Sequence, residues 1–241
     1  MTPGSTPARA LAVGAHPDDI ELFAGATLAT WAAAGCEVHH LICTDGSKGT
    51  WDPAVDTAVL VATRQEEQRE AARILGATGE VVFLDNVDGE LDANRANAHE
   101  VAAWIRRIRP DVVLGHDPWR RWRLHPDHRA AGFLVTDGVV AARDPHFLTD
   151  LGVEHHRPDM LLLFDTAEPD HPVEVTRVAA GIKVEALLAH TSQLLSTMSI
   201  PDDDDGSAES AFRERSIADL VEMGSRFGMP LAEGFHNVGG L

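Results

Sequence analysis

The sequence contains no tyrosine and only two cysteines, Cys36 and Cys43. Two cysteines are too few for a disulfide scaffold, and we expect both to be buried as small apolar side chains. No apolar run reaches the roughly 18 residues that a membrane span requires. Residues 1–10 lack the charged start and long apolar core of a signal peptide. These absences predict a soluble, cytoplasmic protein.

Positive charge is also scarce. The chain has 20 lysines and arginines against 38 aspartates and glutamates, which gives a formal net charge of −18. Such a surface repels the phosphate backbone of nucleic acids and disfavours contact with an anionic membrane. We therefore expect neither a nucleic acid nor a membrane as a partner.

What the sequence does contain is an alternation of short apolar runs and longer helical segments. This alternation is typical of a three-layer α/β fold with a mostly parallel sheet. No domain boundary is evident, so we expect a single domain over 1–241, with a disordered tail at 1–8 and an acidic loop at 201–206. The expected strands are 10–15, 37–44, 81–85, 111–117 and 160–166. The expected helices are Asp19 to Ala34, 58–75, 96–109, 127–142 and 208–227.

Polar residues follow the expected strands at the point where each strand ends. In open α/β sheets, ligands bind beyond the carboxyl ends of the strands, so we expect these side chains to converge. They are His16, Asp18 and Asp19 after the first strand, Asp45 after the second, Asp85 and Asn86 after the third, and His116, Asp117, His125, Asp127 and His128 after the fourth.

The first of these groups lies in the segment AHPDDIE, residues 15–21, for which three interpretations compete. As a helix start, Pro17 suits the first helical position, and acidic residues suit the positive end of the helix dipole. Taken alone, that interpretation is favoured. A phosphate-binding turn is excluded, because G-x-G-x-x-G is missing and Asp18 and Asp19 would repel a pyrophosphate. The third interpretation is a metal site, because histidine and carboxylate together form a common zinc set.

The segment HPDH at residues 125–128 shifts the balance to metal, because it repeats the His-Pro-Asp pattern at a second strand end. Catalytic zinc keeps three protein ligands and one open position. His16 and Asp19 are spaced to converge at the first turn, and the second segment supplies a third ligand. Spacing alone does not say whether that ligand is His125 or His128.

Arg64 lies on a mostly apolar face of the helix expected at 58–75, where a charge is unusual. One interpretation is an ion pair with Glu67 at the helix edge, and the other is a role in the site. Asp45 and Ser47 lie in the turn-rich loop TDGSKG, which can contact sugar hydroxyls.

Several other residues remain ambiguous at this level. Glu21 either caps the helix or braces a ligand. His190, near a helix end, either reaches the site or is a core or surface histidine. Loop tryptophans stack on sugars in some proteins and simply pack in others; these are Trp51, Trp119 and Trp122. The histidines expected to be structural or on the surface are His39, His40, His155 and His156.

With these residues in place, the chain resembles the LmbE/PIG-L family of metal-dependent N-acetyl-sugar deacetylases. The similarity is greatest to the bacillithiol-pathway and chitin-fragment deacetylase branch, in the segments AHPDDIE, TRQEE and AEGF. The matching segments span almost the whole chain in family order: AHPDDIE (15–21), TRQEEQREAARILGA (63–77), PDVVLGHDP (110–118), HPDH (125–128), HTSQ (190–193) and AEGF (232–235).

The resemblance implies a Rossmann-like fold and one zinc ion, or another divalent metal such as Fe²⁺, Co²⁺ or Mn²⁺. The implied metal ligands are His16, Asp19 and His128. Some relatives carry a tyrosine shortly before the second histidine motif, whereas this chain has Arg-Trp-Arg-Leu at 121–124. That departure makes a tyrosine-assisted step doubtful here.

The resemblance also implies catalytic roles. Asp18 matches the general base, His125 matches the residue that faces the substrate oxygen, and Asp127 matches the acid that orients and charges a neighbouring imidazole. Arg64 matches an arginine that reaches the site. With Asp45 and His190, it completes the expected substrate-binding set.

The expected function is therefore removal of the N-acetyl group from an N-acetylglucosamine-type small molecule, by water activated at the metal with Asp18 as base. Either Asp18 or His125 then protonates the leaving amine. Two alternatives remain: an amidase of the same family that acts on a larger acyl or thiol-conjugate substrate, and a non-catalytic metal-binding or sugar-binding homologue. Relatives include oligomers, so a homo-oligomer is also expected.

Overall fold

The computed structural model describes residues 6–239 and 241. Of the tail expected at residues 1–8, residues 1–5 lie outside this described part. Ala8 already makes fixed contacts: its amide donates to Oδ2 of Asp111 (2.7 Å) and its carbonyl accepts from the amide of Glu37 (2.9 Å). The chain is thus tied to two neighbouring segments before its first strand begins.

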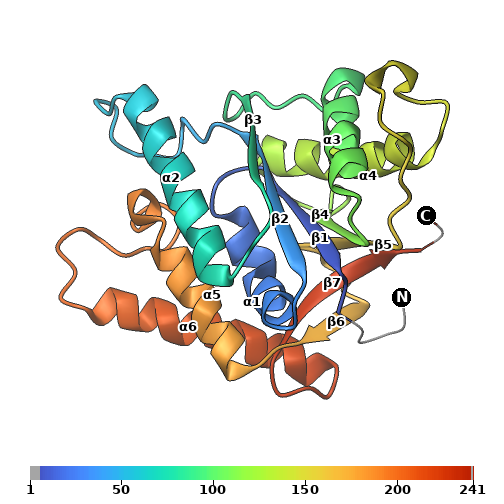
Figure 1. Ribbon diagram of the computed structural model, residues 1–241. Helices are drawn as coiled ribbons and strands as arrows, with labels where there is room; N and C mark the ends of the chain where they lie inside the picture. The colour runs from blue at the N-terminus through green and yellow to red at the C-terminus, as the bar shows by residue number, and fades with distance from the viewer. Residues whose placement is uncertain (1–5, 240) are drawn as a thin grey trace.

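In the described chain, seven strands form one sheet in the order β3-β2-β1-β4-β5-β7-β6 (Figure 1). The first five in that order are parallel to their neighbours, whereas β7 is antiparallel to both β5 and β6. The strand order reverses between β1 and β4, which is where ligands bind in such sheets. The strands are β1 Arg9–Gly14, β2 Glu37–Thr44, β3 Val81–Asn86, β4 Val112–His116, β5 Met160–Phe164, β6 His171–Glu174 and β7 Ala232–Val238.

Helices cover both faces of the sheet and complete a three-layer α/β fold. Figure 1 shows α3 and α4 together on one face, α1, α2 and α5 on the other, and α6 beside α5. The helices are α1 Asp19–Ala33, α2 Thr57–Leu75, α3 Arg95–Ile108, α4 Pro126–Arg143, α5 Arg177–Leu188 and α6 Ser207–Arg226, with short 3-10 turns at Thr149–Leu151 and Thr191–Gln193.

Alternate residues of the central strands bury into two separate cores, because successive side chains of a strand point to opposite faces. Leu11 and Val13 of β1 pack with α3 and α4, whereas Ala10 and Ala12 pack with α1 and α2. Burial on both faces explains why the sequence shows continuous apolar runs there. Both cysteines are free and buried, as expected.

The five strands and five helices expected from the sequence are all present, with ends shifted by no more than two residues. The Rossmann-like, mostly parallel α/β class is confirmed. Three elements go beyond the expectation: α5, β6 and β7. β6 contains Pro172, and β7 carries the buried charged residue Glu233, so neither strand shows a simple apolar run.

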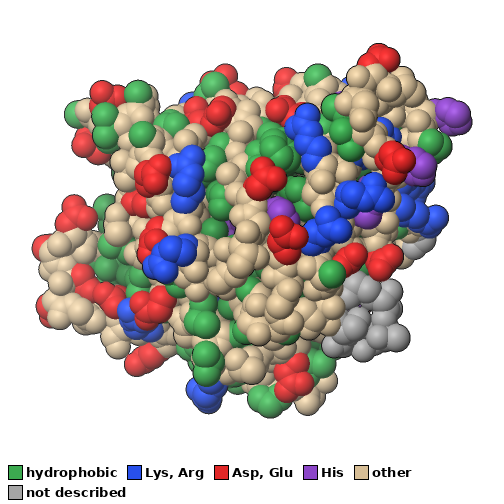
Figure 2. All heavy atoms as spheres, viewed as in Figure 1, with side chains coloured by type: hydrophobic (Ala, Val, Ile, Leu, Met, Phe, Trp, Pro, Cys, Tyr) green, Lys and Arg blue, Asp and Glu red, His purple; other side chains and the backbone are tan. Residues whose placement is uncertain are grey.

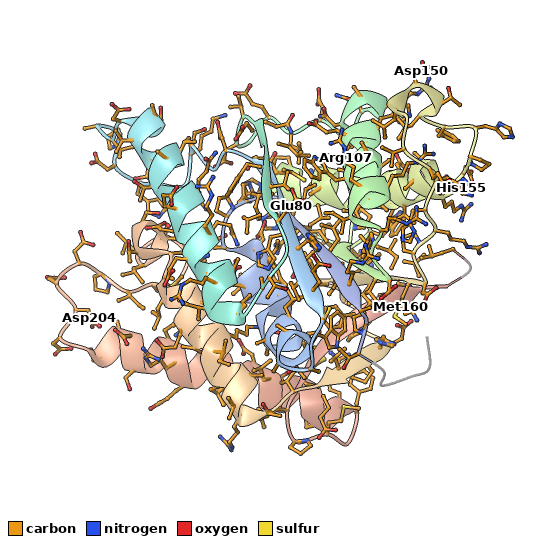
Figure 3. The ribbon with its side chains drawn as sticks, viewed as in Figure 1. Glu80, Arg107, Asp150, His155, Met160 and Asp204 are labelled. Carbon is orange, nitrogen blue, oxygen red and sulfur yellow. The ribbon has the colours of Figure 1, made fainter. Side chains whose placement is uncertain are left out.

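Acidic side chains are spread across the face of the molecule that Figure 2 shows, interspersed with lysine and arginine side chains. No helix in the described chain is long and apolar enough to cross a membrane. The acidic loop 201–206 leads into α6, with Asp204 at the periphery (Figure 3). Its carboxylate accepts from the amides of Ala208 (2.9 Å) and Glu209 (3.1 Å), so this loop starts the helix.

Candidate metal centre and active site

Two loops at the carboxyl ends of neighbouring strands bring the histidine motifs together. His16, Asp18 and Asp19 follow β1, and residues 125–128 open α4 after β4, the strand paired with β1. The site therefore lies at the reversal of strand order, where the sequence pattern places it.

Three side chains from these loops direct ligand atoms at one another. Nδ1 of His16 lies 3.2 Å from Nε2 of His128 and 3.4 Å from Oδ2 of Asp19. Nε2 of His128 lies 3.3 Å from Oδ1 of Asp19. Ligand atoms about 2.1 Å from a tetrahedral zinc are separated by about 3.4 Å. The three side chains therefore fit a single divalent metal, and His125 also lies within metal-binding range of His16 and His128.

His16 is oriented by carboxylates on the side away from these ligand atoms. Its Nε2 lies 3.1 Å from Oδ2 of Asp127 and 3.3 Å from Oδ1 of Asp88. Burial lowers the pKa of His16, but hydrogen bonds with Asp127, Asp19 and Asp88 outweigh it and raise that pKa well above the ordinary value. The same negative environment favours a metal cation at Nδ1.

Asp19 is held as an ionised carboxylate. Its Oδ2 accepts from the amide of His16 (2.8 Å) and lies 3.2 Å from Nε2 of the buried His116. Burial raises the pKa of Asp19, but the charges of His128 and His116 outweigh it, so the pKa lies well below the usual range. Asp19, His116 and His128 also lie within metal-binding range of one another. The contact between His116 and Oδ2 of Asp19 also fits a residue that holds the Asp19 carboxylate in place.

Asp18 adopts a backbone conformation that is rare for a residue with a side chain, with φ 101° and ψ −27°. Strain of this kind is found preferentially at functional sites. Helix α1 begins at Asp19, so Pro17 lies outside the helix, and the Asp18 side chain makes no capping hydrogen bond. The Pro17 part of the helix-start interpretation is therefore wrong, whereas its acidic part is borne out, because Asp19 and Glu21 lie in the first turn of α1.

The Asp18 carboxylate is buried beside one hydroxyl and one guanidinium. Its Oδ2 accepts from Oγ1 of Thr197 (3.0 Å) and lies 3.6 Å from Nη2 of Arg64. Burial raises the pKa of Asp18 above its ordinary value, against the lowering effect of the Arg64 charge. A carboxylate of raised pKa exchanges protons nearer neutral pH, as a general base must.

Arg64 reaches the site from α2, as the resemblance implies. Its guanidinium donates to the carbonyls of Gly46 (2.8 Å) and Pro17 (2.6 Å), so it joins the loop after β2 to the loop after β1. A Cβ at Gly49 would collide with this guanidinium, which explains why the last residue of TDGSKG is glycine. The alternative of an Arg64–Glu67 ion pair does not form.

Glu67 instead anchors the 3-10 turn Thr191–Gln193. Its Oε1 accepts from Oγ1 of Thr191 (2.7 Å) and from the amide of Ser192 (2.8 Å). This anchor fixes the segment that carries Gln193 and Thr197 into the site. Thr197 was not predicted as a site residue, because it belongs to no local motif.

A buried polar network lies beneath Asp18. The amide of Asp18 donates to Oε1 of Gln68 (3.1 Å), and Nε2 of Gln68 donates to Oε1 of Glu21 (2.8 Å). Glu21 lies 3.4 Å from His190 and 3.5 Å from His40. His190 is fully buried and does not line the cavity described below, so its placement supports Glu21 rather than a substrate. Gln68 lies one helical turn after Arg64, a spacing that could have revealed it.

Asp45 supports the loops around the site rather than facing its cavity. Its Oδ1 accepts from the amides of Ser47 (2.9 Å) and Asp88 (3.0 Å), and it does not line the cavity. Asp88, which contacts His16, is missing from the sequence-based set, because a single acid in a turn carries no signal of its own.

The second motif begins α4 as its sequence predicts, with Pro126 in the first turn and His125 as the capping residue. Nδ1 of His125 accepts from the amide of Asp127 (3.3 Å). Burial, followed by the charge of His16, lowers the pKa of His125 below its ordinary value. The Asp127 carboxylate contacts His16 rather than His125, and it also accepts from the amides of Gly89 and Leu91.

A cavity of about 620 Å³, large enough for a small sugar, opens onto the site. Its lining includes His16, Asp18, Asp19, Arg64, Asp88, His125 and His128. Trp51 stands at its rim with 80% of its surface exposed, whereas Trp119 and Trp122 are exposed but do not line it. Arg123, from the stretch where some relatives carry tyrosine, lines the cavity and contacts Nδ1 of His128. Among the structural histidines, His39 and His40 are buried, and His155 points outward at the edge of the molecule (Figure 3).

Comparison with known proteins supports the motif resemblance. The family model described as PIG-L, GlcNAc-PI de-N-acetylase, matches residues 11–139, a span that holds both histidine motifs. The chain belongs to the PIG-L family. This membership confirms the resemblance that the motifs indicate.

Three proteins that are similar to this chain carry deacetylase names. The diacetylchitobiose deacetylase of Thermococcus kodakarensis is 36% identical over 77% of this chain and 70% of its own. The 1D-myo-inositol 2-acetamido-2-deoxy-alpha-D-glucopyranoside deacetylase of Actinosynnema mirum is 31% identical over 79% and 82%. The structure of N,N'-diacetylchitobiose deacetylase from Pyrococcus horikoshii superposes with a TM-score of 0.85 at 29% identity, covering 96% and 84%.

Proposed function

We propose that this protein is a metal-dependent hydrolase that removes the N-acetyl group from an N-acetylglucosamine-type small molecule. The observation that carries the proposal is the convergence of His16, Asp19 and His128, whose ligand atoms lie 3.2–3.4 Å apart. The carboxylate of Asp18, a residue with a strained backbone, lies beside them. The similar proteins named above act on N-acetylated amino sugars by their names.

A divalent metal at His16, Asp19 and His128 would supply Lewis-acid chemistry, making water nucleophilic near neutral pH and polarising a carbonyl. Two imidazoles and one carboxylate suit zinc, and they also accept Fe²⁺, Co²⁺ or Mn²⁺. Asp127 and Asp88 keep Nε2 of His16 occupied, so that its Nδ1 faces the metal position.

Asp18 is the group that we assign to the proton transfers. Its carboxylate lines the cavity, and its raised pKa suits it to take a proton from the attacking water and to return one to the leaving amine. Thr197 holds Oδ2 in place, and Arg64 limits how far the pKa rises.

His125 lines the cavity beside His16, with ring centroids 4.6 Å apart. From this position its ring can donate to the acetyl oxygen as negative charge develops there. Arg64 lines the cavity as expected of a substrate-side residue. Asp45 and His190 are assigned instead to supporting positions, through Asp88 and Glu21.

The test is release of primary amine from a panel: N-acetylglucosamine, its disaccharide, and the malate and inositol conjugates of N-acetylglucosamine. We expect metal-loaded enzyme to release amine and acetate in equal amounts. Metal-free enzyme and the Asp18→Asn variant should release almost none. Binding of one metal per chain with no amine from any substrate would contradict the proposal and favour a non-catalytic homologue or a larger acyl substrate.

A further inference from the structure

A second cavity of about 320 Å³ adjoins the catalytic one. We call it the α6 cavity, since α6 forms its outer wall, with α1, α5 and β7 around the rest. Four residues line both cavities: Leu22, Phe23, Arg120 and Asp165. A group attached to a ring in the catalytic cavity therefore has a neighbouring space to enter.

The boundary between the two cavities is an ion pair. Arg120 pairs with the Asp165 carboxylate and also donates to the Asp165 carbonyl (3.1 Å). Nη2 of Arg123, on the catalytic side, lies 2.7 Å from Oδ2 of the same carboxylate. Asp165 has a left-handed backbone with φ 56°, so its side chain is held at this boundary by an unusual conformation.

The floor of the α6 cavity is rigid. Nζ of Lys183 donates to Oε1 of Glu233 (2.7 Å), and both side chains are buried. The Glu233 carboxylate also accepts from the amides of Ala26 (3.2 Å) and Thr27 (2.7 Å) within α1. A fixed floor lowers the ordering cost of binding a ligand there.

The walls combine apolar and hydroxyl-binding surface. Leu187, Leu220 and Met223 offer apolar contact, and Thr166 and Ser216 offer hydroxyl groups. A sugar ring presents the same combination, with apolar C–H faces and polar edges.

The charged residues of the α6 cavity restrict which ligands it can bind. The two cations of the α6 cavity, Arg120 and Lys183, are already paired with Asp165 and Glu233. Asp219, exposed on α6, makes no ion pair within the described chain, so the cavity wall carries one unpaired negative charge. An anionic group is therefore disfavoured, and a neutral or amine-bearing one is accepted.

We propose that the α6 cavity is a second substrate subsite that binds a neutral or amine-bearing polyhydroxylated ring linked to the N-acetylated sugar. This inference rests on the proposed deacetylase function and extends it. It makes the disaccharide of N-acetylglucosamine a better substrate than the monosaccharide, and a carboxylate-bearing aglycone a poorer one.

The test fills the cavity without touching the metal centre. Ser216→Trp places an indole in the α6 cavity, and Val221→Trp adds the same ring on an exposed position of the same helix. The readout is the ratio of kcat/KM for the disaccharide to kcat/KM for N-acetylglucosamine. We expect Ser216→Trp to lower this ratio about tenfold, and Val221→Trp to leave it unchanged. An unchanged ratio in Ser216→Trp, with fold and metal content intact, would overturn the subsite.

A change of charge at Asp219 tests whether the aglycone of the substrate occupies the α6 cavity. Asp219→Asn should raise kcat/KM for the malate conjugate of N-acetylglucosamine relative to the disaccharide, because it removes the unpaired negative charge. No change in that ratio would contradict the charge argument.

Failure of the deacetylase function would look different. Wild-type enzyme would then release no amine from any sugar, and calorimetry with the disaccharide would decide the subsite on its own. Binding that Ser216→Trp weakens about tenfold would support the α6 cavity, and equal binding by both proteins would overturn it.

Discussion

Nε2 of His16 lies 3.1 Å from Oδ2 of Asp127, although the two residues are 111 positions apart in the chain. The contact joins the two histidine motifs, because Asp127 belongs to the second motif and orients a ligand in the first. It also leaves Nδ1 of His16 to face His128 and Asp19. The metal position is thus defined by both motifs together.

We predict that Asp127→Asn weakens metal binding about 10-fold to 100-fold, because it removes the acceptor that fixes the His16 ring. Competition with a chromogenic chelator measures the affinity. Asp137→Asn, on the exposed side of the same helix, is the matched control and should bind metal like wild type. Equal affinity in both variants would show that Asp127 does not orient the ligand.

A variant that lacks the proposed general base, Asp18, should bind metal normally but lose turnover. Asp18→Asn is nearly isosteric, so we expect metal content to stay at one ion per chain while kcat falls roughly 10²-fold to 10⁴-fold. Elemental analysis and amine release on the same sample give both quantities. Full turnover in this variant would remove Asp18 from the proton transfers.

A substitution at Thr197 should perturb the Asp18 carboxylate less than Asp18→Asn does. Thr197→Val keeps the shape but loses the hydroxyl that donates to Oδ2 of Asp18 (3.0 Å). One hydrogen bond to a charged group is lost, so we expect kcat to fall about threefold to tenfold with unchanged metal affinity. A steady-state comparison with Ser196→Ala checks that the effect belongs to the Asp18 contact. A wild-type kcat would rule the contact out.

The acidic loop before α6 gives a stability prediction with a defined pH dependence. Hydrogen bonds from the amides of Ala208 and Glu209 hold the pKa of Asp204 below its ordinary value. A depressed pKa stabilises the fold above the unfolded pKa of about 3.9 and ceases to do so as pH falls through the folded value. Asp204→Ala should therefore lower Tm at pH 7 more than Asp203→Ala does. The difference should shrink below about pH 4, and equal Tm values at pH 7 would contradict a stabilising role for these hydrogen bonds.

The sequence predicts the central sheet well, because strands buried on both faces leave continuous apolar runs such as residues 10–15. It does not predict β7, because that strand lies antiparallel between β5 and the edge strand β6 and carries Glu233. The burial of Glu233 depends on Lys183, 50 residues away, and on amides inside α1. A partner so distant in sequence leaves no local pattern.

The same distinction applies to the site. His16, Asp19 and His128 lie in repeated motifs, and their convergence follows from the paired strands β1 and β4. Asp88 and Thr197 come from loops without a motif, and only the fold shows that they contact His16 and Asp18.

Asp45 and His190 illustrate the opposite case. Both lie in segments that suggest a site role, yet in the folded chain neither side chain lines the catalytic cavity. Asp45 binds loop amides, and His190 is buried against Glu21. Proximity to a strand end therefore identifies the neighbourhood of the site but not which side chains face its cavity.

The central claim is that one metal, held by His16, Asp19 and His128, makes this site a deacetylase. The most direct measurement is amine release from an N-acetylglucosamine substrate as metal-free enzyme is titrated with Zn²⁺. We predict that activity rises linearly and reaches a plateau at one equivalent per chain, and that His128→Ala stays inactive over the same range. Full activity in the metal-free enzyme, or a wild-type titration curve in His128→Ala, would contradict the account.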